Sequence, residues 1–128
     1  MVIDREFGRK LIEKLKSQDK KVVFTNGCFD IMHRGHLETL KHLKSISDFV
    51  VVGLNSDNSV HRLKGPNRPV NLENDRAYFL SVLKFVDLVV IFEEDNPFEI
   101  IKIIKPDVLL KGGDYRKEDI VGSSFVEN

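Results

Sequence analysis

Two histidines flank a glycine in the stretch FTNGCFDIMHRGH, which covers residues 24–36. The stretch follows a short apolar run, and Gly27 and Gly35 would allow a tight turn and a close approach of a ligand to the backbone. Imidazoles near the start of a helix can donate hydrogen bonds to phosphate oxygens, and the free N–H groups of the helix attract anions. The residues therefore favour a phosphate-binding site that uses His33 and His36.

Two other interpretations of this stretch stay open on the residues alone. One is an ordinary capped helix with histidines on its surface. The other is a zinc site formed by Cys28, His33 and His36. It is the weakest of the three, because the stretch has no second thiol and no common zinc-ligand spacing.

A second polar segment reads LNSDNSVHRLKGPNRPV and starts where another apolar run ends. Lys64 stands beside Gly65 in this segment and could meet a phosphate as a point charge. Arg62 and Arg68 are weaker candidates for the same role. Taken one at a time, these basic residues are better explained as part of a solvated loop. Asp57 could hold ligand hydroxyls or could cap a helix.

A third polar segment, KGGDY, closes the last apolar run. Gly112 and Gly113 would allow close approach of a flat ring or a ribose. Asp114 could accept hydrogen bonds from ribose hydroxyls or help to bind a metal ion, and Tyr115 could stack or donate a hydrogen bond. The alternative is a plain turn at the end of a strand.

Charged residues outside these segments are less specific. Arg76 could reach a phosphate or pair with nearby acids, and the two outcomes are equally supported. Glu93, Glu94 and Asp95 precede a predicted helix, where negative charge suits the helix dipole. A structural role is the better interpretation of these three acids.

The apolar periodicity predicts an alternation of strands and helices. Helices are expected over residues 1–19, 34–44, 75–83 and 97–105, and strands over 21–26, 49–54, 88–92 and 108–111. Residues 55–74 are expected to form a long loop with room for one helical turn. Phe24, Phe29, Phe49 and Phe79 are expected in the core. This pattern is typical of an α/β fold, a doubly wound parallel sheet with helices on both faces. Such folds bind ligands beyond the carboxyl ends of the strands, where strand order reverses.

The length, net charge and cysteine count of the chain restrict the kinds of protein that it can be. Its 128 residues indicate a single domain, and 20 basic and 20 acidic residues cancel, which argues against nucleic acid or an anionic membrane as a partner. No apolar run reaches the roughly 20 residues that span a bilayer. The single cysteine fits a reducing compartment, and the charged N-terminal segment is unlike a signal peptide. We expect a soluble cytoplasmic protein.

The motifs also resemble a known family. GCFDIMHRGH resembles the HxGH signature of the nucleotidyltransferase superfamily that includes the cytidylyltransferases. The longer string TNGCFDIMHRGHLETL is similar to one branch, the adenylyltransferases that make ADP-heptose from heptose 1-phosphate. The likeness continues through VVGLNSDNSVHRLKGPNRPVN, DRAYFLSVLKFVDLVVIFEEDNPFEII and IKPDVLLKGGDY, over residues 20–122. It implies a Rossmann-like fold.

The resemblance implies a reaction in which a sugar phosphate oxygen attacks the α-phosphorus of ATP in the presence of Mg²⁺. The sugar would be D-glycero-D-manno-heptose 1-phosphate, and no residue is expected to ligate a metal. The implied roles fall into three sets. The catalytic residues are His33, His36 and Lys64, the nucleotide-binding residues are Thr25, Asn26, Gly27, Cys28, Phe29, Gly35, Asp57, Arg76, Gly112, Asp114 and Tyr115, and the substrate-binding residues are Asp30, Arg62 and Arg68.

Two alternatives to this function are kept. One is a cytidylyltransferase acting on glycerol phosphate or another phospho-alcohol, and the other is a non-catalytic nucleotide-binding module. Relatives of this kind often pair, so a homodimer is also an expectation. The family continues for a further strand and helix with a Ser/Thr-rich motif, and Ser123 and Ser124 come too early to supply it. We therefore expect this part of the domain to be missing.

Overall fold

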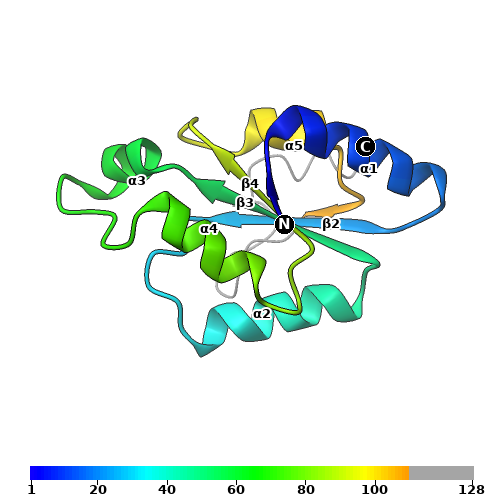
Figure 1. Ribbon diagram of the computed structural model, residues 1–128, viewed down its shortest axis with the longest axis horizontal. Coiled ribbons are helices and arrows are strands. Elements are labelled where there is room, and N and C mark those ends of the chain that lie inside the picture. Colours follow the sequence, from blue (N-terminus) through cyan, green and yellow to red (C-terminus); the bar gives the residue numbers. More distant parts are fainter. Residues whose placement is uncertain (110–128) are drawn as a thin grey trace.

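The computed structural model describes residues 1–109, and in this part of the chain five strands form one parallel sheet (Figure 1). The order of the strands across the sheet is β1-β4-β3-β2-β5. Their bounds are β1 Val2–Ile3, β2 Val22–Gly27, β3 Phe49–Asn55, β4 Leu88–Phe92 and β5 Val108–Leu109. The chain runs from β2 outward through β3 to β4 and then returns to the other side of β2, so strand order reverses at β2.

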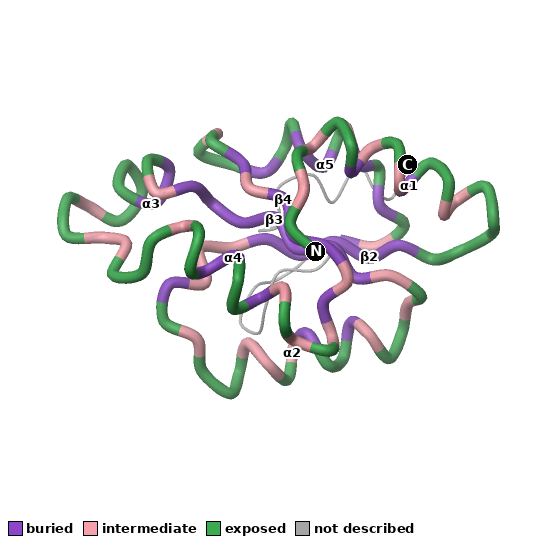
Figure 2. The backbone as a smooth tube through the Cα atoms, in the orientation of Figure 1, coloured by how far each residue is buried: buried purple, intermediate pink, exposed green. Residues whose placement is uncertain are grey.

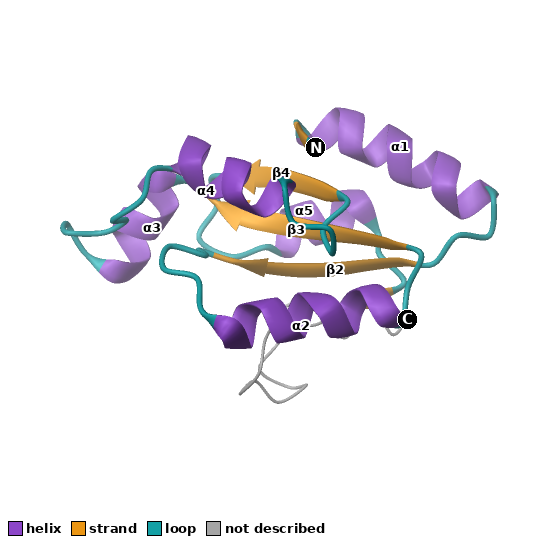
Figure 3. Ribbon diagram, turned by 60° about the horizontal axis from the view of Figure 1, so that its bottom comes forward, coloured by secondary structure: helices purple, strands orange, loops and turns teal. Residues whose placement is uncertain are grey.

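Helices cover both faces of this sheet, which confirms the doubly wound α/β fold. Helices α1 and α5 pack on one face and α2 and α4 on the other, while α3 lies beyond the carboxyl ends of the strands (Figures 1 and 3). Their bounds are α1 Arg5–Ser17, α2 Arg34–Ser45, α3 Asp57–Lys64, α4 Glu73–Ser81 and α5 Phe98–Ile104. Of the helices in this described part, none is long and apolar enough to cross a membrane.

The three long strands are buried on both faces, which is typical of continuous apolar runs in parallel sheets (Figure 2). Alternate residues of β3 face opposite layers, so Val51 packs with α1 and α5 while Val50 packs with α2 and α4. Gly53 interrupts the run for a steric reason. A Cβ atom there would lie 2.5 Å from Cζ of Phe24, so a larger residue would displace that ring.

The N-terminal segment differs from the prediction of one helix over residues 1–19. The structure begins with the edge strand β1, which pairs with β4, and the helix starts only at Arg5. Asp4 ends the strand and caps the helix, because its carboxylate accepts a hydrogen bond from the backbone N–H of Phe7 at 2.8 Å. Strand pairing depends on a distant partner, so local periodicity could not reveal it.

The predicted long loop over residues 55–74 is wrong in part, because α3 occupies eight of its residues. The helix has few apolar residues, and polar contacts fix it in place instead. Asp57 is not its cap. Ser56 takes that position, and its hydroxyl accepts a hydrogen bond from the backbone N–H of Ser59 at 3.1 Å.

The four phenylalanines expected in the core separate into three groups. Phe24 is fully buried, and Phe29 and Phe49 are partly buried against the two core layers. Phe79 is 47% exposed, so its prediction as a core residue is wrong. Helix α4 spans Glu73–Ser81 and turns Ala77 and Leu80 toward the sheet, which directs the intervening Phe79 to the surface.

Candidate active site

A cleft of about 770 Å³ lies at the carboxyl ends of β2 and β3, where the fold predicts a ligand site. Both strands end in polar residues, and α2 and α3 begin just beyond them. Most of the residues predicted to bind nucleotide or substrate line this cleft. They are Thr25, Asn26, Gly27, Cys28, Phe29, Asp30, His33, Gly35, His36, Lys64 and Arg68.

The two histidines form a reciprocal cap at the start of α2. Nδ1 of His33 accepts a hydrogen bond from the backbone N–H of Gly35 at 2.9 Å, and Nδ1 of His36 accepts one from the N–H of His33 at 3.1 Å. A neutral imidazole whose Nδ1 accepts must carry its proton on Nε2. Each ring therefore keeps one N–H donor that the helix cap does not use.

The pKa of His36 favours the neutral form of its imidazole. Burial lowers the pKa of His36, and the neighbouring His33, with ring centroids 4.1 Å apart, lowers it further. Gly35 serves this arrangement as well. A Cβ atom on Gly35 would lie 2.7 Å from Cε1 of His33, so glycine leaves room for the capping ring. The sequence reasoning had assigned that space to a ligand.

Phe29 lines the cleft and adopts an unusual backbone conformation. Its φ is 48°, in the left-handed region that bulky residues rarely occupy. Its ring covers Gly27, where a Cβ atom would lie 3.1 Å from Cε2 of the ring, and its centroid is 5.6 Å from that of His36. Strained backbone of this kind concentrates at functional sites, because the surrounding structure must hold it in place.

Asp30 connects the histidine segment to the loop before α4. Its buried carboxylate accepts hydrogen bonds from the backbone N–H groups of Val70 and Asn71 and from Nε of Arg68, at 2.8 to 3.0 Å. Burial raises the pKa of Asp30, but the hydrogen bonds from Asn71 and Val70 and the charge of Arg68 outweigh it and lower the pKa overall. The terminal nitrogens of Arg68 have no partner within residues 1–109.

Lys64 ends α3 at the rim of the cleft. Its side chain is exposed, and its ammonium makes no hydrogen bond or ion pair with any of the described residues. Together with Arg68 and the two imidazoles it gives the cleft four hydrogen-bond donors and at least two positive charges. The N-terminus of α2, where Gly35 and His36 line the cleft, adds partial positive charge, so the cleft suits a polyanion such as a triphosphate.

Arg76 has its guanidinium inside the protein and does not line the cleft. It donates hydrogen bonds of 2.7 to 2.8 Å to the carbonyl oxygens of Asn71, Cys28 and Asn55 and to the carboxylate of Asp57. Of the two outcomes that the sequence left open, pairing with an acid is therefore observed. The arginine joins three segments that form the walls of the site, and contact with a nucleotide stays a prediction.

Other predicted residues lie elsewhere. Arg62 and Asp57 do not line the cleft, and Gly112, Asp114 and Tyr115 lie outside the described residues. The sequence reasoning also missed several residues that line it: Ile31, Thr39, Leu40, Asn55, Leu63, Asp95, Asn96 and Pro97. Residues 95–97 follow β4 at the same edge of the sheet, so the rule that located the other loops could have found them.

The two carboxylates that line the cleft, those of Asp30 and Asp95, already have hydrogen-bond or ion-pair partners within the protein. Asp30 is held by backbone N–H groups and Arg68, and Asp95 pairs with Arg62 at 2.7 Å. Within residues 1–109 no group of three His, Cys, Asp or Glu side chains is placed to hold a metal ion. The described residues therefore do not fit a protein-held Mg²⁺ site, nor the zinc site considered for Cys28, His33 and His36.

Comparison with known proteins identifies the family of the chain. The model of the cytidylyltransferase-like family matches residues 24–123, a range that includes the three polar segments identified in the sequence. The chain belongs to the cytidylyltransferase-like family. Members of the family are nucleotidyltransferases, so the domain is a nucleotidyltransferase, as the sequence predicted.

The relatives of this chain include longer proteins. The chain is 56% identical over 117 residues to the bifunctional protein HldE of Sulfurimonas denitrificans, which covers 91% of the chain and 24% of that protein. It is 50% identical over 126 residues to the HldE protein of Wolinella succinogenes, which covers 98% of the chain and 27% of that protein. The chain thus spans about a quarter of the length of these relatives.

A solved structure confirms the fold. It is the crystal structure of the lipopolysaccharide core biosynthesis protein from Thermoplasma volcanium, and it is similar to this chain with a TM-score of 0.64 and 31% identity. The match covers 70% of this chain and 72% of the other.

Proposed function

We propose that this domain transfers AMP from ATP to a sugar 1-phosphate, D-glycero-D-manno-heptose 1-phosphate, and releases ADP-heptose and pyrophosphate. The observation that carries the proposal is the convergence of His33, His36, Lys64 and Arg68 on one cleft at the carboxyl edge of the sheet. The HldE relatives and the relative named for lipopolysaccharide core biosynthesis support a sugar phosphate as the acceptor.

The reaction requires little covalent chemistry from the protein. An oxygen of the sugar phosphate attacks the α-phosphorus of ATP, a new P–O bond forms, and the bond from the α-phosphorus to the β-phosphate oxygen breaks. The electron pair leaves with pyrophosphate. The protein has to hold two polyanions together in line and stabilise the charge that develops on the phosphoryl oxygens.

Different side chains of the cleft bind the phosphates and stabilise the developing charge. The Nε2–H groups of His33 and His36 are fixed by the helix cap and donate hydrogen bonds to phosphoryl oxygens without reorganising. Lys64 neutralises phosphate charge from the end of α3, and Arg68, oriented by Asp30, offers its terminal nitrogens to a second phosphate. We assign the neutral imidazoles to electrostatic stabilisation, because the lowered pKa of His36 leaves it uncharged near neutral pH.

The choice of nucleotide defines a second candidate function. The family takes its description from cytidylyl transfer, so CTP with a phospho-alcohol acceptor keeps the same mechanism. A competition assay in which ATP and CTP are present with each acceptor decides between them. Exclusive use of CTP would replace the proposed substrates but keep the assigned roles of the residues.

The proposal is tested at His36. In His36→Asn the amide oxygen can still accept the hydrogen bond from the backbone of His33, but no donor reaches the position of Nε2. We expect pyrophosphate release from ATP and heptose 1-phosphate to fall by about 10²- to 10³-fold. His36→Gln is the matched control, because its amide nitrogen reaches the position of Nε2 and should retain part of the rate.

The same variant separates catalysis from binding alone. Calorimetry of ATP binding to His36→Asn should show a much smaller loss than the rate does. Binding of ATP with no turnover by the wild-type protein would support a non-catalytic nucleotide-binding module, and an unchanged rate in His36→Asn would refute the role of the imidazole.

A further inference from the structure

Helix α3 presents one side to the cleft and another to the turn that follows β4. We call this turn, formed by Glu93, Glu94 and Asp95, the acidic turn. Leu63 and Lys64 of α3 line the cleft, whereas the residues of α3 that bind the acidic turn do not. The sequence predicted only that negative charge in the acidic turn would suit the following helix.

Two buried serines make the inner part of this contact. The hydroxyl of Ser56 donates a hydrogen bond to the carboxylate of Glu93 at 2.9 Å. The hydroxyl of Ser59 donates one to the carbonyl oxygen of Glu94 at 3.0 Å and accepts another from the amide of Asn55 at 3.0 Å. Both serines are fully buried, so loss of either hydroxyl would leave buried polar groups without a partner.

Arg62 makes the outer part of the contact. Its Nε donates a hydrogen bond to the carboxylate of Asp95 at 2.7 Å, and its Nη2 donates to the carbonyl oxygen of Glu93. Ser56, Ser59 and Arg62 are spaced three residues apart, so they follow one side of α3. The arginine is exposed, and its pair with Asp95 is expected to contribute less than the buried serines do.

The acidic turn is held from its other side by α1. Arg5 donates two hydrogen bonds to the carboxylate of Glu94, at 2.7 and 2.9 Å. Hydrogen bonding to Arg5 lowers the pKa of Glu94 despite partial burial, so the pair stays charged near neutral pH. Glu94 therefore connects the wall of the cleft to a helix that packs directly on the sheet.

Lys64 depends on this support. Its long side chain has no partner among the described residues, so the end of α3 sets the region that its ammonium can reach. We propose that the acidic turn positions Lys64 for the reaction by holding α3 through Ser59 and Arg62. These two are positioning residues that act through Lys64, and the inference rests on the proposed function. Under this inference Arg62 supports the site through the acidic turn and does not bind the substrate.

A double-mutant cycle tests the inference with the full 128-residue chain. Ser59→Ala should lower kcat/KM for pyrophosphate release by about 10-fold, chiefly through KM, because Lys64 is displaced from the phosphates. In a Lys64→Ala background the same change should cost less than about 2-fold. An equal loss in both backgrounds would overturn the proposal, since Ser59 would then act on stability or on other parts of the cleft.

A second variant tests the inference independently, in case Ser59→Ala fails to fold. Arg62→Gln changes only an exposed side chain, and we expect about a 3-fold loss that again disappears in the Lys64→Ala background. Arg9→Gln is the matched control, because Arg9 is a partly exposed arginine of α1 that pairs with Glu6 and Glu13 away from the cleft. It should leave the rate unchanged.

Pyrophosphate binding separates this inference from the proposed function. Calorimetry with pyrophosphate alone needs no acceptor, and Lys64→Ala and Ser59→Ala should both weaken binding by similar factors. If neither variant weakens it, the positioning of Lys64 is refuted, while the loss of rate in His36→Asn still tests the reaction on its own.

Discussion

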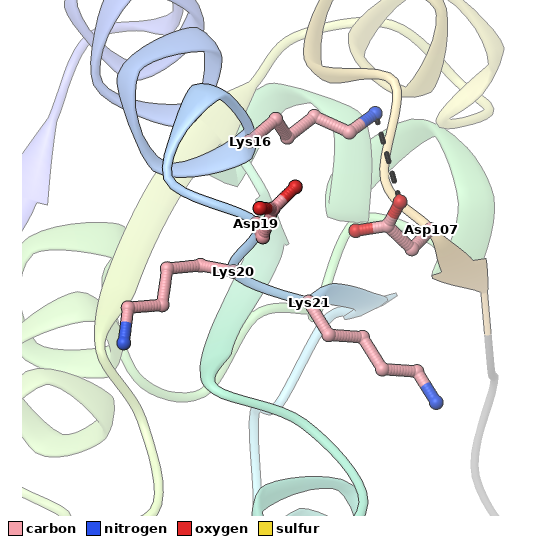
Figure 4. Close-up of a pocket in the computed structure, with 5 residues that line it drawn as sticks. All are labelled: Lys16, Asp19, Lys20, Lys21 and Asp107. Atoms are coloured by element: carbon pink, nitrogen blue, oxygen red, sulfur yellow. Dashed lines mark ion pairs between the residues drawn. The ribbon is translucent and has the colours of Figure 1, made fainter.

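The two ends of the sheet both carry basic residues at a hollow, yet they are built differently. At the carboxyl end, helices α2 and α3 begin, and the cations Lys64 and Arg68 line a cleft of about 770 Å³. At the amino end, a hollow of about 440 Å³ forms where α1 ends, and the residues that line it are Lys16, Asp19, Lys20, Lys21 and Asp107 (Figure 4).

The lysine side chains of the amino-end hollow do not converge on a common point. Lys20 and Lys21 diverge, and Lys16 turns toward Asp107, 3.9 Å away, and donates to the carbonyl oxygen of Lys105 (Figure 4). The hollow meets the C-terminus of α1, where the partial negative charge of the helix dipole repels an anion. We infer from the comparison that helix direction and the support of each side chain, rather than the number of lysines, decide where a polyanion would bind.

The largest effect on stability is expected from Arg76, the buried support of the carboxyl end. Arg76→Met would leave three carbonyl oxygens and the carboxylate of Asp57 without their donor, and we expect the free energy of unfolding to fall by about 3–5 kcal/mol. Urea denaturation measures the change. Lys16→Met at the amino end is the matched control, and its exposed pair should contribute less than about 1 kcal/mol. Equal losses at the two ends would contradict the comparison.

Asp30 and Asp107 provide a second pair across the sheet, because each carboxylate accepts a backbone N–H and contacts a basic side chain. Asp30→Asn places an amide N–H against a donor in a buried site, so we expect a loss of about 2–3 kcal/mol and a higher KM for the acceptor phosphate. Asp107 is exposed, so Asp107→Asn should lower the free energy of unfolding by about 1 kcal/mol or less. An unchanged KM in Asp30→Asn would show that Arg68 does not need its carboxylate partner.

The pH dependence of stability should also distinguish Asp30. Its pKa is lowered in the folded state, so its stabilisation is complete above the unfolded value of about 3.9 and disappears as pH falls through the folded value. Acid titration of the wild type and of Asp30→Asn should therefore give unfolding free energies that converge below about pH 4. A constant difference down to pH 2 would mean that the charge of Asp30 does not contribute.

A smaller pH effect is expected at His36. Its pKa is lowered in the folded state, chiefly by burial, so folding disfavours the imidazolium. Stability should fall as pH drops below about 6.5 and continue to fall until the folded pKa is passed. In His36→Asn this slope should be shallower between pH 7 and 5, as measured by thermal unfolding. Identical slopes would refute the assigned direction.

The smallest effects are expected at the exposed lysines of the amino end. Lys20→Ala and Lys21→Ala should each change stability by less than about 0.5 kcal/mol and leave nucleotide binding unchanged. Calorimetric titration with ATP measures this. Weaker ATP binding in either variant would show that the amino-end hollow also holds nucleotide.

Much of this molecule could be read from its sequence, and the failures have a common cause. The strands β2, β3 and β4 and the histidine-bearing helix α2 follow from apolar periods that involve near neighbours only. The sequence predicted only one helical turn in the region of α3, because the contacts that stabilise this helix are polar and come from the acidic turn, more than 30 residues away along the chain. Phe79 was misplaced because composition does not say which side of α4 meets the sheet.

The sequence by itself determined the alternation of elements, and with it the edge of the sheet where polar residues from separate segments must meet. It also determined the chemistry available there, since glycine spacing and two imidazoles suit phosphate. Only the tertiary structure decided how each side chain is used. Asp30 meets Val70 across 40 positions, and Arg76 meets the carbonyl oxygen of Cys28 across 48. Hydrogen bonds over such separations depend on the path of the whole chain, and no local pattern encodes them.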